Sequence, residues 1–259
     1  GCAAGGGSSG GSWLVIGVAL VSILGGRRRV SALVAAGLAA GLAAPHDARG
    51  GGFDAVTFRP TPAGSAFFSQ DGPAVLYRGG LRLGLGFDLA SDLLVVRDPD
   101  TGEILMDGEV VASRAMLHLG AAFGLPGGIE VAADLPLALA QDGDLALVRP
   151  DDELATTQLG DLRIHGKRRL GGHLALAATI GVPTGSADAF TGDGQFSFTP
   201  RLIAGFEVGR LALAASAGYR MRSAASTTNL TVDDEVVGGL AGSVRVAGRV
   251  WLLAEVYVA

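Results

Sequence analysis

The stretch LRLGLGFDLA, residues 81–90, alternates large apolar side chains with charged or small ones. A period of two residues is the period of a β-strand, because successive side chains of an extended backbone point to opposite faces. Arg82 and Asp88 fall on the same side of such a strand, together with glycines, whereas leucines and Phe87 fall on the other. The stretch therefore predicts a strand with one apolar face and one polar face.

The same alternation recurs to the end of the chain and predicts nine antiparallel strands. Their expected ranges are 81–96, 115–125, 129–140, 159–170, 173–182, 195–208, 210–222, 236–246 and 249–257. Every second connection is two to four residues long, and the others are mostly about ten or longer. Short periplasmic turns that alternate with longer external loops are typical of outer-membrane β-barrels. The expected fold class is thus an all-β, antiparallel transmembrane barrel.

The charged residues decide which face of each strand meets lipid, since an Arg or Lys at the bilayer midplane costs about 2–4 kcal/mol. The apolar face is expected to meet lipid and the charged face a polar lumen. The residues expected to face lipid are Leu81, Leu83, Leu85, Phe87, Leu135, Leu137, Phe196, Phe198 and Leu202. The charged residues expected to face the lumen are Arg82, Asp88, Glu130, Asp134, Asp161, Arg163, Lys167, Arg201 and Arg245.

The composition agrees with a membrane protein and excludes some partners. Hydrophobic residues make up 49% of the 259 residues, the mean hydropathy is +0.41 and only 17% of the residues are charged. Soluble domains usually contain about 25% charged residues. The net charge of −5 and the scattered basic residues give no patch for nucleic acid. The single cysteine excludes an internal disulfide.

The first 76 residues divide into three segments. Two apolar runs, residues 13–24 and 30–44, predict short helices, each shorter than the roughly 20 residues that cross a bilayer. The second run follows three arginines and ends in small residues, so residues 30–49 are expected to be a secretory signal peptide. One uncleaved anchor helix over both runs is the alternative, but three arginines in its middle would cost about 2.5–3.5 kcal/mol each. Residues 50–76 are expected to form a periplasmic segment.

Residues 1–29 resemble the MYXO-CTERM tail of exported myxobacterial proteins, in which a cysteine, a Gly/Ser spacer, a short apolar segment and an arginine cluster follow one another. Such a tail belongs at the C-terminus of a protein. Residues 1–29 are therefore expected to be such a tail or upstream translated sequence.

Residues 53–259 resemble the N-terminal outer-membrane barrel of the OmpA family in myxobacteria and related bacteria. The segments that carry the resemblance are FDAVTFRPTPAGSAFF, LGDLRIHGKRRL, VPTGSADAFTGDGQFSFTPRL, LAASAGYRMR, NLTVDDEVVGGLAG and WLLAEVYVA. In that family the barrel precedes calcium-binding thrombospondin type 3 repeats and a peptidoglycan-binding domain. The resemblance implies a location in the outer membrane and peptidoglycan as a partner through a domain beyond this chain. Because bacterial barrels have even strand numbers, residues 77–259 are expected to be a partial barrel, truncated within its sheet.

No catalytic, cofactor or metal site is expected. The stretch DPDTGE, residues 98–103, resembles the start of a calcium loop, but Asp, Pro and Gly in this order favour a plain turn. The stretch GVPTGS, residues 181–186, lacks the Gly-Lys-Ser/Thr that cradles phosphate. His118 and His165 are expected to face the lumen, and the serines nearest to them in sequence carry no nucleophile motif.

The expected function is a structural envelope anchor that displays surface loops and has no enzymatic activity. A porin or hydrophobic-solute channel is the first alternative, because lumen charges either form ion pairs that fill the interior or line a water channel. A soluble, secreted β-sandwich adhesin is the second alternative. It would require the apolar faces of the strands to pack against one another.

Overall fold

The structure is a computed structural model, and seven stretches of the chain are described by it. They are residues 53–55, 58–62, 67–98, 100–149, 151–227, 230–248 and 250–258. The tail-like segment, the signal-peptide layout and the two short helices expected before residue 50 lie outside the described residues. These expectations stay predictions.

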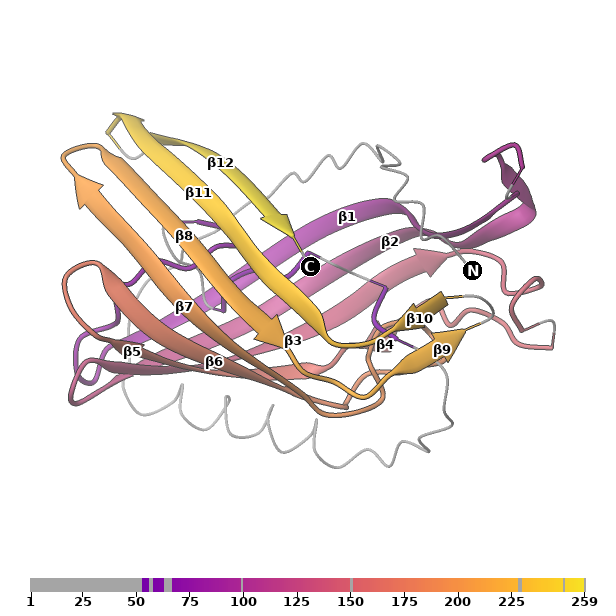
Figure 1. Cartoon of the computed structure of the whole chain (residues 1–259), viewed down its shortest axis with the longest axis horizontal. Coiled ribbons are helices and arrows are strands. Elements are labelled where there is room, and N and C mark those ends of the chain that lie inside the picture. The colour runs from indigo at the N-terminus through magenta and orange to yellow at the C-terminus, as the bar shows by residue number, and fades with distance from the viewer. Residues whose placement is uncertain are drawn as a thin grey trace.

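Nine strands follow one another in a single antiparallel sheet that curls into a half-barrel (Figure 1). In sheet order they are β1 (Leu81–Arg97), β2 (Ile104–Leu125), β3 (Ile129–Asp142), β5 (Leu162–Arg169), β6 (Leu174–Val182), β7 (Ser197–Val208), β8 (Leu211–Arg220), β11 (Glu235–Ala247) and β12 (Val250–Val258). The short β4 (Gln158–Leu159) also pairs with β3, and β9 (Ala225–Thr227) pairs only with β10 (Leu230–Val232). The described residues contain no helix. The prediction of an antiparallel all-β fold is confirmed.

Short turns and long loops gather at opposite ends of the sheet (Figure 1). Connections of two to four residues join β2 to β3, β5 to β6, β7 to β8 and β11 to β12. Gly127 and Gly209 stand in two of these turns with φ of +79° and +62°, a region that glycine enters without a steric penalty. The remaining connections lie at the other end. The predicted alternation of connection lengths is confirmed.

β2 begins eleven residues earlier than the expected start at residue 115. Its pairing with β1 shifts register three times between Ser91 and Arg97, so β-bulges break the alternation that marks a strand in the sequence. Asp92 has a φ of +52° at this point. The connection after β1 is therefore shorter than expected and consists only of the turn at residues 98–103. This turn is the tip of a long β1–β2 hairpin, which extends past the neighbouring strands (Figure 1).

The side chain of Asp98 holds that turn together. Its Oδ1 accepts hydrogen bonds from the backbone N–H groups of Asp100 at 2.8 Å and Thr101 at 3.1 Å. These two donors favour the charged carboxylate and lower its pKa below the usual range. The carboxylate is thus used within the turn.

The two faces of the sheet differ in polarity as well as in exposure. On β3, Glu130 and Asp134 are buried, whereas Val131 and Leu139 are exposed. Seven of the nine side chains expected to face lipid are exposed, and Leu135 and Leu137 are half-buried. The last two stand opposite leucines of β2, and Leu137 also stands opposite Leu159 of β4, so their neighbours shield them.

The segment that precedes β1 lies against the polar face. Asp71 contacts Lys167 of β5, Ser69 contacts Glu255 of β12, and the backbone of Leu76 contacts β3. β12 lies far from β3 and β5 in the sheet order, so one short segment can contact all three only from the inner side of the curled sheet. The polar face is therefore the concave face. Residues 50–76 were expected to form a periplasmic segment, and that location stays a prediction. The described part of this range fills the inside of the sheet.

We call the sheet the wall and the described part of residues 53–80 the inner segment. Small residues of the wall make room for the inner segment. Phe67 packs on Ala212, Ala214 and Ala241, which lie on β8 and β11. A Cβ added at Gly124 of β2 would stand 2.1 Å from the carbonyl oxygen of Tyr77. The backbone of the segment therefore approaches the wall as closely as glycine permits.

Replacing Gly124 by alanine is expected to push the inner segment from the sheet and to lower the free energy of unfolding by about 1–3 kcal/mol, as overpacking usually does. Gly166→Ala is the matched control, because an added Cβ at Gly166 meets no atom within 4 Å. Urea unfolding in detergent micelles measures both effects. Equal stability of the two variants would contradict this placement of the segment.

Candidate functional site

The nine charged residues expected to face the lumen differ in burial. Six of them are buried: Asp88, Glu130, Asp134, Asp161, Arg163 and Lys167. Arg201 is half-buried, whereas Arg82 and Arg245 are exposed. Both exposed arginines lie close to the turn end of their strands, where a long side chain reaches solvent.

One chain of polar contacts crosses four adjacent strands on the concave face. His118 Nε2 lies 2.7 Å from Asp88 Oδ2, and His118 Nδ1 lies 3.8 Å from Asp134 Oδ1. Arg163 donates from its Nε to Asp134 Oδ2 at 2.9 Å. All four side chains are buried. The alternation predicted their common face. In the strand register Asp134 stands directly opposite Arg163, whereas His118 reaches Asp88 and Asp134 diagonally, two residues from a direct pair.

A second cluster joins the wall to the inner segment. The Lys167 ammonium lies 3.0 Å from both carboxylate oxygens of Asp71 and 3.4 Å from Glu130 Oε1. Glu130 Oε2 also accepts the backbone N–H of Leu76 at 2.8 Å. Two carboxylates, one from the wall and one from the segment, thus share one buried cation.

Glu255 of β12 holds the same segment from the other side of the half-barrel. Its carboxylate accepts the backbone N–H groups of Ser69 at 2.7 Å and Gln70 at 2.9 Å. The N–H of Phe68 and the hydroxyl of Ser69 donate to it as well. Sequence reasoning missed Glu255, although the alternation in VWLLAEVYV, residues 250–258, places it on the polar face.

A small core closes the loop end of the concave face. Phe53 packs edge-on against Phe190, with ring centroids 5.6 Å apart. Val110 and Val111 of β2 and Leu145 of the loop after β3 complete this core. The sequence alone gave no sign of it, because Phe53 and Phe190 lie in stretches without periodicity.

The buried Arg114 ties the same end together. It donates to Gln141 Oε1 at 2.8 Å, to the carbonyl of Phe190 at 3.0 Å and to the carbonyl of Ala189 at 3.1 Å. A cation that satisfies backbone carbonyls of a loop fixes the loop in place. The loop between β6 and β7, residues 183–196, therefore folds over the loop end of the concave face.

Asp161, next to β5, also binds this loop. Its two carboxylate oxygens accept the backbone N–H groups of Gly185 at 2.9 Å and Asp193 at 2.8 Å. Burial, opposed in part by these two donors, raises the pKa of the Asp161 carboxyl to about 6. Its charge therefore changes in mildly acidic solution.

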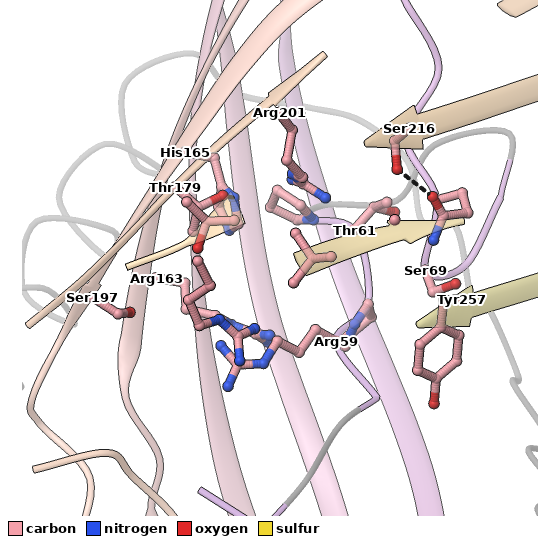
Figure 2. A pocket seen from close by; sticks show the side chains of 18 of the residues that line it. Arg59, Thr61, Ser69, Arg163, His165, Thr179, Ser197, Arg201, Ser216 and Tyr257 are labelled. Atoms are coloured by element: carbon pink, nitrogen blue, oxygen red, sulfur yellow. Dashed lines mark hydrogen bonds between the residues drawn. The ribbon is translucent and has the colours of Figure 1, made fainter. Parts of the chain in front are cut away.

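A cavity of about 90 Å³ lies between the inner segment and the strands β5 to β8, β11 and β12. Arginines and hydroxyl side chains gather around it, including Arg59, Arg163 and Arg201 (Figure 2). Ser216 donates to Gln70 Oε1 across one side at 2.7 Å. Sequence reasoning did not predict this cavity.

Within the described stretches, no group of three or more His, Cys, Asp or Glu side chains is placed to hold a metal ion. The same stretches contain no helix long and apolar enough to cross a membrane. Comparisons add no counterpart, since no protein-family model, curated protein or solved structure matches the chain.

Removing the carboxylate of Asp134 is expected to leave Arg163 and His118 without their shared acceptor. Loss of one partner of a buried ion pair usually costs about 3–5 kcal/mol, so Asp134→Ala should lower the free energy of unfolding by that amount. Asp152→Ala is the control, because Asp152 is exposed and lies 3.9 Å from its nearest cation, Arg149. Urea titrations compare the two, and a loss below 1 kcal/mol for Asp134→Ala would contradict the network.

Proposed function

We propose that this chain is an outer-membrane β-barrel of the OmpA-like kind, a structural element of the cell envelope whose interior is filled by its own inner segment. The observation that carries the proposal is the opposite polarity of the two faces of one curled sheet. Under this proposal the chain anchors the envelope and displays loops at the cell surface, and it catalyses no reaction.

The apolar convex face supports contact with lipid. Leu83 is 45% exposed, Leu202 is 51% exposed and Val256 is 62% exposed, on strands that span the sheet from β1 to β12. Soluble monomers rarely expose a continuous apolar patch of more than a few hundred Å². Hydrocarbon removes this cost, and the hydrogen bonds between neighbouring strands satisfy the backbone there.

The contacts of the inner segment support a filled interior rather than a channel. Lys167 and Glu255 bind the segment from two distant strands, and Phe53 closes the loop end. Narrow barrels usually fill their interiors with side chains. The porin alternative would require this segment to leave the concave face.

The sandwich alternative requires a cover for the leucine face, and in the described stretches these side chains are exposed. The link to peptidoglycan rests on the family resemblance of residues 53–259 alone, through a domain beyond this chain.

Environment-sensitive labels test contact with lipid. In a Cys2→Ser background, a fluorophore on Leu83→Cys or Leu202→Cys is expected to report a nonpolar surrounding in vesicles and to be quenched by lipid-borne quenchers. A label on Thr101→Cys, in the exposed turn after β1, is the control and should report water. Aqueous signals from Leu83→Cys and Leu202→Cys in the folded protein would contradict the proposal.

Planar-bilayer recordings separate the filled barrel from a channel. The protein is expected to show no stable open state, and Glu255→Ala should increase conductance because it removes the acceptor that holds the inner segment. Glu207→Ala, which removes an exposed carboxylate of β7, is the control. Reproducible large conductance of the unaltered protein would favour the porin alternative.

A further inference from the structure

The cavity behind the inner segment carries an excess of positive charge. Four arginines line it, Arg59, Arg163, Arg201 and Arg220, whereas no described lining residue is an Asp or a Glu. Figure 2 shows three of them around the hollow, two from the wall and one from the inner segment. A concentration of guanidinium groups without a facing carboxylate attracts anions.

Three of these arginines are already neutralised by carboxylates outside the cavity. Arg59 pairs with Asp54 at 3.3 Å, and Arg163 pairs with Asp134 at 2.9 Å between Nε and Oδ2. The guanidinium of Arg220 pairs with Glu235.

Arg201 of β7 differs from the other three. Among the described residues it has neither a hydrogen bond nor an ion pair, and its Nε is enclosed without an acceptor. The charges of Arg163 and Arg59 oppose that of Arg201, and the attracting carboxylate of Asp71 is already bound to Lys167. Arg201 is half-buried, and an enclosed donor such as its Nε is costly when it lacks an acceptor. Its free donors therefore point to a missing acceptor.

The surrounding donors favour a tetrahedral oxyanion. Ser197 and Thr199 line the cavity from β7 and are buried, and Arg59 approaches from the inner segment. His165 adds an enclosed Nε2 that has no hydrogen-bond partner. Donors on several sides suit four oxygens better than the planar carboxylate, which one arginine fork satisfies. The volume of about 90 Å³ also exceeds the ~10–15 Å³ that one water needs.

We propose that this cavity is a binding site for a phosphate-type oxyanion, with Arg201 as its principal charged ligand. The phosphate belongs either to a free anion or to the ester of a lipid headgroup, because both present the same oxygens. The inference does not rest on the proposed membrane location, since the cavity lies on the concave face.

Isothermal titration of the full chain, refolded in detergent, with inorganic phosphate tests the site. Phosphate is expected to bind and to raise the thermal midpoint above that in chloride of equal ionic strength. Arg201→Gln should weaken binding about tenfold or more, the usual effect of losing a charged hydrogen-bond donor. Arg168→Gln is the matched control, because Arg168 is exposed on β5 and does not line the cavity. It should change the affinity less than about twofold.

Ser197→Ala keeps the charge of the site and guards against a folding defect of Arg201→Gln. It is expected to weaken phosphate binding about threefold to tenfold while it leaves the fold intact. Glycerol 3-phosphate, a soluble mimic of a lipid headgroup, binds more tightly than phosphate if the ligand is an ester and less tightly if it is the free anion.

Three results would overturn the site. The first is a thermal midpoint of the unaltered chain that phosphate shifts no more than chloride does. The second is phosphate affinity that Arg201→Gln and Ser197→Ala both leave unchanged, which would mean that the cavity holds only water. The third is tighter binding of acetate than of either phosphate compound, which would exclude a tetrahedral ligand.

Discussion

The pairing of buried charges on the concave face underlies the whole arrangement. Strand alternation sends charged side chains of β1, β2, β3 and β5 to one side of the sheet, and each must find a partner there, because an isolated buried charge is costly. Asp88, His118, Asp134 and Arg163 satisfy one another across strands. The curl of the sheet brings these residues together and leaves the apolar side chains on the outside.

The inner segment meets the charges that the wall does not neutralise. Asp71 approaches Lys167, and backbone N–H groups of residues 68–70 approach Glu255. This contact explains the alanines and glycines of the wall, since larger side chains there would hold the inner segment away from the carboxylates of Glu130 and Glu255. Electrostatics and shape therefore select the same path for the segment.

The sequence predicted what depends on local periodicity and missed what depends on distant contacts. The nine strands that follow one another in the sheet, the short turns between them and the face of Asp134 were predicted from the period of two and the turn residues, whereas the short β4, β9 and β10 were not predicted. The start of β2 could not be predicted in this way, because the shifts of register between Ser91 and Arg97 interrupt the alternation. The place of the inner segment and the cavity beside Arg201 could not be read either, since residues 53–80 have no periodicity and their partners lie far away in sequence.

The contact between Ser69 and Glu255 also orders the folding of the chain. These residues are 186 positions apart, and the segment that precedes every strand of the sheet binds the last of them. Closing so long a loop is entropically costly and slow, so local hairpins form first. The segment can complete its contacts only after β12 has joined the sheet. The inner segment therefore docks late in folding. Before it docks, the polar face of the sheet is in contact with water.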